Sequence, residues 1–211
     1  MIQVITVTSH IEPTIPLVET LLKHNWRHSI IETPWRGFGT KIIKTYEYLI
    51  ANPEITEFIF CDAFDVYAFG TPEEFMEKLD TSGILMSAER GLWPQTLESF
   101  RKLYVSCVGD FNYINSGLYY APRDLFIELF ESNPPKYETD DQEWFNMHYL
   151  HTPNSRISID NFQKVFNSHS FIREGEYGYD NGRLQILGNE PVFTHKNART
   201  VDDKLEEIVK S

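Results

Sequence analysis

Hydrophobic spacing in the first ninety residues alternates between the two-residue period of strands and the longer period of helices. Apolar and β-branched runs predict strands at residues 2–8, 29–31, 57–61 and 83–87. Helical spacing predicts helices at residues 16–24, 41–50 and from residue 72 onward. Thr40 and Thr71 are expected to cap the second and third helices, and Pro72 suits a first helical position. The alternation predicts an α/β domain with a parallel sheet.

The second half of the chain has a less regular pattern. Strand-like runs occur at residues 114–120, 155–159, 183–187 and 191–194. Helical spacing recurs at residues 123–131, 141–150 and 201–210. Asn133-Pro134-Pro135 separates the first two of these helices. The 211 residues suit one domain with a sizeable core.

Composition and charge narrow the setting of the protein. The formal net charge is −12 and no basic stripe is present, so bulk binding to nucleic acid is not favoured. An acidic chain can still bind an anionic nucleotide if a divalent cation lies between them. No apolar run approaches the roughly 20 residues of a membrane span, and the N-terminus does not resemble a signal peptide. Cys61 and Cys107 form no metal-ligand pair and no disulfide framework, so a reducing cytoplasm is expected, either of a bacterium or of a host cell infected by a virus. No membrane partner is expected.

Two carboxylates follow the most apolar of the predicted strands. Asp62 comes directly after Phe58-Ile59-Phe60-Cys61, and Asp65 lies three residues further on. Ligands of open α/β sheets bind beyond the carboxyl ends of strands, and two carboxylates there repel each other unless a cation joins them. Mg²⁺ or Mn²⁺ suits such oxygen ligands, and a nucleotide diphosphate would complete the coordination shell. A polar turn in which Asp65 caps a neighbouring element explains the same residues.

Other polar residues near the predicted elements have both a functional and a structural interpretation. His195 follows a short apolar strand, where an imidazole ligand would favour Mn²⁺ over Mg²⁺, although a lone histidine there is more often structural. Asp140 and Asp141 precede a helix, where they either cap it or meet a sugar or an acceptor hydroxyl. Gly117 of Asn115-Ser116-Gly117 either lets a ligand approach the backbone or marks a bulge.

A set of short motifs runs in order along nearly the whole chain, from Ile2 to about Leu205. The motifs are Trp35-Arg36-Gly37, Phe60-Cys61-Asp62-Ala63-Phe64-Asp65-Val66, Ser87-Ala88-Glu89 with Trp93-Pro94, Asn115-Ser116-Gly117, Asp140-Asp141-Gln142, Ser158-Ile159-Asp160 and Pro191-Val192-Phe193-Thr194-His195-Lys196-Asn197. Together they resemble the glycosyltransferase domain of the procollagen lysyl hydroxylase and procollagen galactosyltransferase families. Two departures are Lys196, where the family usually has glycine, and an acidic run before Gln142 that is shorter than usual.

The resemblance implies a GT-A fold, which is an α/β fold with a Rossmann-like mixed sheet flanked by helices and an acceptor-side extension. Residues 1–211 would form a single domain, with a nucleotide-binding half at 1–110 and a sugar and acceptor half at 111–211. The family uses a UDP-sugar as donor and Mn²⁺ as cofactor, and Mg²⁺ is the alternative ion. The implied metal ligands are Asp62, Asp65 and His195.

The resemblance also assigns roles around the nucleotide and the sugar. Thr6 and Thr8 would lie near the uridine, and Phe64 would stack near the nucleotide. The implied cofactor-binding residues as a whole are Thr6, Thr8, Trp35, Lys41, Phe64, Lys196 and Asn197, with the two lysines near the phosphates and Trp35 on a loop over the site. The implied catalytic residues, which face the sugar, are Asn115, Asp140 and Asp141.

The expected activity is metal-dependent transfer of a hexose from UDP-glucose or UDP-galactose to an acceptor with a free hydroxyl. The acceptor is a hydroxylysine-like protein site, a glycan or a hydroxymethylated base, and inversion and retention at the anomeric carbon both stay open. A homodimer is compatible with these features. Two other functions fit the same motifs, namely a catalytically silent nucleotide-sugar-binding module and a nucleotidyltransferase that releases pyrophosphate.

Overall fold

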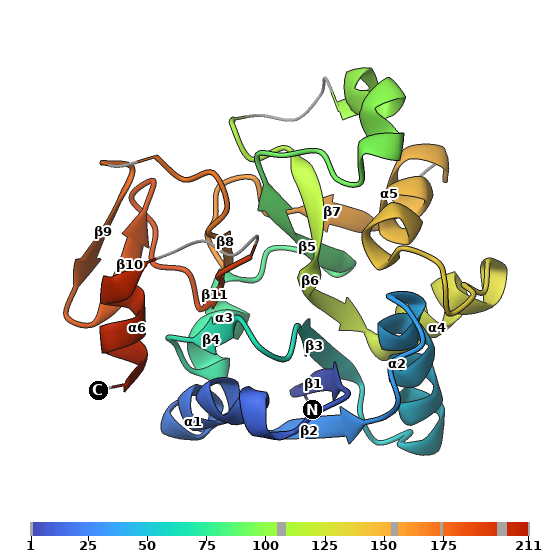
Figure 1. Ribbon diagram of the computed structural model, residues 1–211, viewed down its shortest axis with the longest axis horizontal. Coiled ribbons are helices and arrows are strands. Elements are labelled where there is room, and N and C mark those ends of the chain that lie inside the picture. The colour runs from blue at the N-terminus through green and yellow to red at the C-terminus, as the bar shows by residue number, and fades with distance from the viewer. Residues whose placement is uncertain (1, 105–108, 153–155, 174, 198–201, 211) are drawn as a thin grey trace.

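A mixed six-stranded sheet forms the centre of the protein (Figure 1). The computed structural model describes residues 2–104, 109–152, 156–173, 175–197 and 202–210. The strands of this sheet are β1 (Ile2–Thr8), β2 (His28–Glu32), β3 (Glu57–Cys61), β5 (Ile84–Glu89), β6 (Tyr113–Pro122) and β7 (Ile157–Ile159). Their order across the sheet is β2-β1-β3-β6-β5-β7.

The strand β6 makes the sheet mixed. β1 is parallel to β2 and β3, as the alternating pattern predicted, but β6 is antiparallel to both of its neighbours, β3 and β5. Residues 114–121 of β6 are buried, so this strand occupies the interior of the sheet and separates β3 from β5. The purely parallel sheet predicted from the first ninety residues is therefore wrong, and the mixed sheet implied by the resemblance is confirmed.

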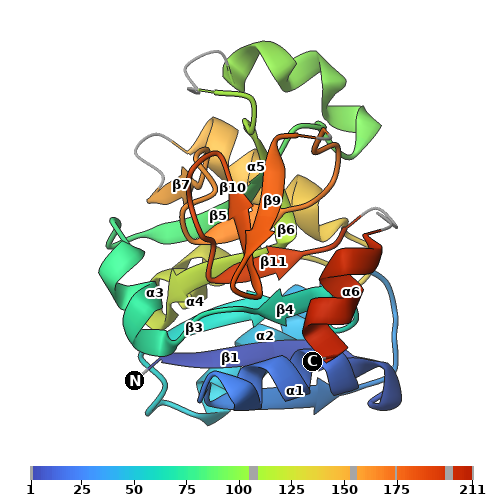
Figure 2. The same ribbon diagram turned by 90° about the vertical axis from the view of Figure 1, so that its left-hand side faces the viewer.

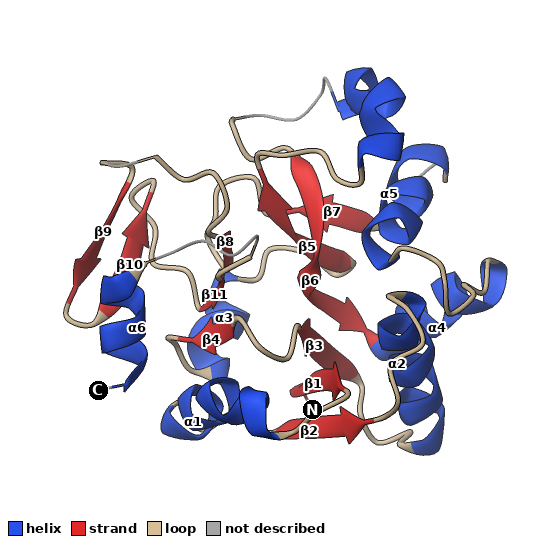
Figure 3. Cartoon of the chain, viewed as in Figure 1, coloured by secondary structure: helices blue, strands red, loops and turns tan. Residues whose placement is uncertain are grey.

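Helices cover both faces of the central sheet (Figure 3). One face carries α2 (Gly39–Ala51), α4 (Arg123–Ser132) and α5 (Asp141–His151), and the other carries α1 (Ile15–Lys23) and α3 (Pro72–Lys78). Alternate residues of a strand point to opposite faces, so Phe58 and Phe60 of β3 join the first core while Ile59 and Cys61 join the second. Burial on both faces explains why β3 is a continuous apolar run.

A smaller three-stranded sheet packs against the second face. It has the order β4 (Val66–Ala68), β11 (Phe193–His195) and β8 (Phe166–Ser168). The hairpin of β9 (Tyr177–Asp180) and β10 (Arg183–Ile186) follows, and the last helix, α6 (Asp203–Lys210), lies near α1 (Figure 2). β4, β8 and β9 have no counterpart among the strands predicted from the sequence, because a run of three or four residues carries too little periodicity.

Two 3-10 helices, one of three residues and one of ten, complete the elements in the part of the chain that the structure describes. They lie at Glu12–Thr14 and Gln95–Tyr104. None of the helices among the described residues has the length and apolar character needed to cross a membrane.

The two predicted helix caps have different outcomes. Thr71 caps α3 as expected, because its hydroxyl accepts a hydrogen bond from the Glu74 amide at 3.3 Å. The expectation for Thr40 is wrong, since α2 already begins at Gly39 and the Thr40 hydroxyl accepts a bond from the Arg36 amide instead. A Cβ at Gly39 would lie 2.0 Å from the Lys136 carbonyl oxygen, so only glycine lets the start of α2 approach that segment.

Asp160 fixes the chain between β7 and β8. Its carboxylate is buried and accepts hydrogen bonds from the amides of Lys164, Val165 and Phe166 at 2.8–3.0 Å. We expect Asp160→Ala to lower the free energy of unfolding by about 3 kcal/mol, because three backbone amides, two of them buried, lose a charged acceptor. Urea denaturation measures this change.

The exposed Asp80 provides the matched control for Asp160. It makes only a 3.6 Å ion pair with Lys164, so Asp80→Ala should change the stability by less than about 0.5 kcal/mol. Equal urea midpoints for the two variants would contradict the structural role of Asp160.

Candidate active site

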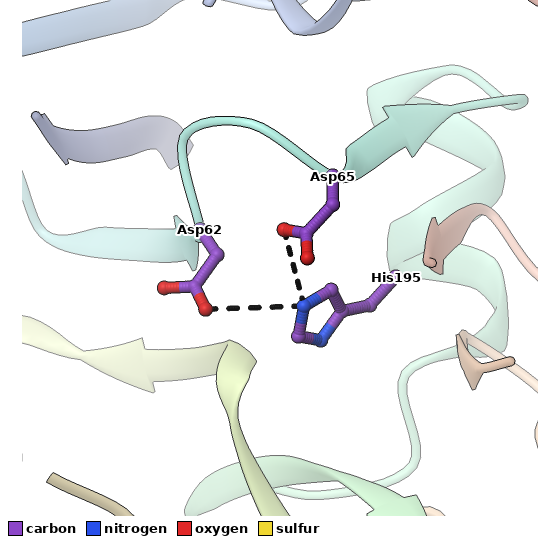
Figure 4. Close-up of side chains that lie close together, drawn as sticks. All are labelled: Asp62, Asp65 and His195. Atoms are coloured by element: carbon purple, nitrogen blue, oxygen red, sulfur yellow. Dashed lines mark ion pairs between the residues drawn. The ribbon is translucent and has the colours of Figure 1, made fainter. Parts of the chain in front are cut away.

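Asp62, Asp65 and His195 converge where the two sheets meet (Figure 4). Asp62 directly follows β3 and Asp65 directly precedes β4, while His195 is the last residue of β11. The antiparallel pairing of β4 with β11 places Val66 opposite His195 and so carries Asp65 to the imidazole. The His195 Nε2 atom lies 3.2 Å from an Asp65 oxygen and 3.8 Å from an Asp62 oxygen. One ligand atom from each of the three residues falls within 4.8 Å of the others.

Two residues of β6 hold this group in place. A Cβ at Gly117 would lie 2.2 Å from His195 Cε1 and 2.6 Å from Asp62 Oδ2, so only glycine leaves room for both side chains. The Asn115 side-chain oxygen accepts a bond from the Gly117 amide and lies 2.8 Å from His195 Nδ1. Nδ1 is therefore the donor in that contact, and Nε2 is directed toward the carboxylates in the way typical of metal-binding histidines.

The charges of the group suit a divalent cation. Burial lowers the pKa of His195, but attraction by Asp65 and Asp62 outweighs it and raises this pKa. Burial raises the pKa of Asp65, but attraction by His195 and its hydrogen bond give a net decrease. The two carboxylates and the imidazole place one ligand atom each close enough together to bind one ion. An imidazole among oxygen ligands suits Mn²⁺ better than Mg²⁺.

Lys41 connects this group to the sugar-facing half predicted from the sequence. Its ammonium, carried by α2, lies 2.7 Å from Asp62 and 2.9 Å from Asp141. Burial works against the charged form, yet the attraction of Asp141 and Asp62 raises the pKa of Lys41 well above its usual value. Asp141 also accepts a hydrogen bond from the Ser116 hydroxyl at 3.0 Å, so its carboxylate is held on two sides.

A cavity of about 630 Å³ opens beside these residues. The predicted residues that line it are Lys41, Asp62, Asp65, Asn115, Asp140, Asp141, His195 and Asn197. Asp140 also caps α5, because its Oδ1 accepts a bond from the Glu143 amide at 2.9 Å. The capping and the site-facing interpretations of Asp140 are therefore compatible.

Glu89 lines the same cavity; it belongs to the Ser87-Ala88-Glu89 motif but was not predicted as a site residue. It ends β5 with 6% of its surface exposed and accepts bonds from the side chains of Gln142 at 2.7 Å and Asn197 at 2.8 Å. Burial raises the pKa of Glu89, and the amide hydrogen bonds only partly oppose this. A glutamate that closes an otherwise apolar strand is the sequence signal that could have identified it.

The other predicted residues lie outside the lining of this cavity. Thr6 is buried, and its hydroxyl has no hydrogen-bond partner among the described residues. The Thr8 hydroxyl bonds to the backbone of His10, and Lys196 pairs with Glu206 of α6. Trp35 and Phe64 are half exposed.

The fold defines the class of this protein. Over its whole length the chain superposes on a glycosyltransferase involved in the glycosylation of the major capsid of PBCV-1, with a TM-score of 0.58, 12% identity and 99% of that chain covered. It also superposes over its whole length on the galactosyltransferase LgtC in complex with donor and acceptor sugar analogues, with a TM-score of 0.51, 11% identity and 95% of that chain covered. The protein has the GT-A fold of these glycosyltransferases.

The family is narrower than the fold. The PLOD GT domain matches residues 23–202, so the chain belongs to this glycosyltransferase family. The multifunctional procollagen lysine hydroxylase and glycosyltransferase LH3 of Homo sapiens and that of Pongo abelii are each 26% identical over 196 residues, which is 87% of this chain. The chain spans about a quarter of the length of these relatives, since 26% of each is covered.

Gly117 offers a test of the three converging side chains. In Gly117→Ala the new methyl group must displace His195 or Asp62, so we expect the affinity for Mn²⁺ to fall by about tenfold or more. Titration of the purified protein with Mn²⁺, followed by electron paramagnetic resonance, measures the affinity.

Gly178 is the control for this substitution. A Cβ there meets no atom within 4 Å, so Gly178→Ala should leave the Mn²⁺ affinity unchanged. Tight Mn²⁺ binding by a folded Gly117→Ala protein would show that the ion is held elsewhere.

Proposed function

We propose that this glycosyltransferase moves a hexose, glucose or galactose, from a UDP-sugar to an acceptor hydroxyl with the help of a divalent cation. Mn²⁺ fits best as the ion, and Asp62, Asp65 and His195 are its proposed ligands. The observation that carries the proposal is the convergence of these side chains at a cavity that also contains the buried ammonium of Lys41. Donor binding by the half at 1–110 and acceptor binding by the half at 111–211 form part of the same proposal.

The nucleotide-binding roles are proposed from the family resemblance, and the lining of the cavity supports them for Lys41 and Asn197. When bound, the cation would neutralise the charge that develops on the diphosphate as the nucleotide leaves. Lys41 and Lys196 are proposed to add positive charge near the phosphates. The Thr6 hydroxyl is buried without a hydrogen-bond partner among the described residues, so it is proposed to bond the nucleotide. The remaining proposed nucleotide contacts are Thr8, Trp35, Phe64 and Asn197.

The transfer breaks the bond between the anomeric carbon and the β-phosphate oxygen, and that electron pair leaves with UDP. The acceptor oxygen forms the new bond to the anomeric carbon and loses its proton. Both aspartates line the cavity, but Asp141 is engaged by Lys41 and Ser116, whereas Asp140 accepts a capping bond at Oδ1 and has a pKa that burial raises above its usual value. Asp140 is therefore the better-placed proton acceptor for an inverting reaction, with Asn115 and Asp141 positioning the sugar.

Release of UDP from the purified protein tests the proposal without an acceptor, because water can replace the acceptor slowly. With UDP-glucose and UDP-galactose we expect Mn²⁺-dependent release from one donor, and none after addition of a chelator. Asp65→Asn should reduce release to the chelator level, because a neutral amide replaces a charged ligand.

Asp124→Asn is the control for the metal ligand, since Asp124 has 90% of its side chain exposed and lies outside the cavity lining. Full activity of Asp65→Asn would contradict the proposed metal site. Pyrophosphate release from a nucleoside triphosphate would instead favour a nucleotidyltransferase, and Mn²⁺-dependent UDP binding without turnover would favour a silent module.

Asp140→Asn tests the proposed base. Asparagine caps helices as well as aspartate does, so the stability should persist while sugar transfer falls by about 100-fold. Single-turnover transfer gives the rate, and proton NMR of the product gives its anomeric configuration. A loss below about threefold, together with retained configuration, would assign the proton to the leaving phosphate instead.

A further inference from the structure

Phe171 exposes an apolar ring at the cavity although its backbone is firmly held. It follows β8, has φ 59°, and leaves 70% of its surface exposed. A positive φ is uncommon for a residue with a bulky side chain and persists only where the surroundings impose it. The ring nevertheless lines the cavity described above.

Two polar side chains, of Asn197 and Arg90, hold the backbone at and before Phe171. The Asn197 side-chain oxygen accepts a bond from the Ser170 amide, and Arg90 donates a 2.9 Å bond to the Phe171 carbonyl. Arg90 itself lies over the ring of Phe111 and bonds both oxygens of Glu176. This hydrogen bonding lowers the pKa of Glu176 to about 2, so the ion pair persists at neutral pH. The surrounding hydrogen bonds therefore fix the backbone that exposes Phe171 at the cavity.

Two further exposed aromatic rings share the cavity with Phe171. Trp93 is 56% exposed and Phe38 is 52% exposed, and both contribute to its lining. Carboxylate and amide groups lie within the same cavity, from Glu89, Asn115 and Asp140. A pyranose ring matches this combination, because its C–H faces are apolar and its hydroxyl groups donate to carboxylate and amide oxygens.

We propose that the acceptor is a saccharide, that Phe171 contacts its pyranose ring, and that Arg90 is the positioning residue for Phe171. The proposal rests on the proposed function. The lining carries five carboxylates against one lysine and one histidine, which disfavours the phosphates of a nucleic-acid acceptor. The strands that line the cavity, β5 and β6, are interior strands of the sheet, so they have no open edge to which an extended peptide could pair.

Transfer to simple glycosides tests the proposal. The probes are methyl α- and β-glycosides of glucose and galactose, with the donor that supports UDP release and with Mn²⁺. We expect the wild type to use at least one of them, and Phe171→Ala to raise its KM by about tenfold while acceptor-free UDP release stays within about twofold. Phe171→Tyr should restore the KM, because the aromatic face is retained.

Phe162→Ala is the matched control, since Phe162 is 49% exposed and lies outside the cavity lining. It should leave both the KM and the UDP release unchanged. Arg90→Lys should also raise the KM for the glycoside acceptor and should leave kcat unchanged. In the double variant of Arg90→Lys and Phe171→Ala, the KM should be little higher than in Phe171→Ala alone. A change in kcat alone would contradict the positioning role of Arg90.

The outcomes separate this inference from the function on which it rests. Mn²⁺-dependent UDP release without transfer to any of these glycosides, or with transfer only to a hydroxylysine peptide, would overturn the saccharide acceptor and leave the proposed function standing. An equal loss of UDP release and transfer in Phe171→Ala would overturn the acceptor contact. Absence of UDP release from the wild type would contradict the proposed function itself and this inference with it.

Discussion

Repulsion among carboxylates is the constraint on which the architecture of the site depends. Asp62 and Asp65 are partly buried and Asp141 is buried, and like charges in such positions are tolerated only when cations stand between them. Lys41 supplies one such cation between Asp62 and Asp141, and His195 supplies a second contact for Asp65. Removal of one partner from a buried charged group costs about 3–5 kcal/mol, so the elements that carry these side chains depend on one another.

The backbone is shaped to bring those charges together. Lys41 reaches the site because α2 begins at Gly39, where the missing side chain lets the helix approach the segment before α5. His195 and Asp62 reach each other because Gly117 leaves space on β6, and β6 in turn is an interior strand between β3 and β5. The pairing of β5 with β6 also shifts register between Met86 and Ser87, where the partner changes from Tyr119 to Asn115, so Gly117 lies at an irregularity as the bulge interpretation expected. The groups that approach its backbone are side chains of this chain.

The sequence could predict those parts of the structure that have a local pattern of residues. β1 and the cap of α3 follow from local periodicity and residue chemistry, and the order of the motifs indicates the family. The three-residue strands β4 and β8 have no such signal, although β4 is the strand that carries Asp65 to His195. Glu89, although part of a recognised motif, was not predicted as a site residue for a related reason, because its contacts join it to Gln142 and Asn197, which are distant in sequence and adjacent only in space.

Glu89 and Asn197 also link the end of β5 to the segment that presents Phe171 across the cavity lining. Asn197 donates to Glu89 and accepts from Ser168 and Ser170, so one side chain ties the end of β5 to the segment that presents Phe171. Asn197 lies two residues after His195, and Asn115, which positions the imidazole, also bonds Glu89. The hydrogen bonds that hold His195 and the Phe171 segment therefore share buried amide side chains, which would lose bonds if either part moved alone. This shared network joins the group of Asp62, Asp65 and His195 to the segment that presents Phe171.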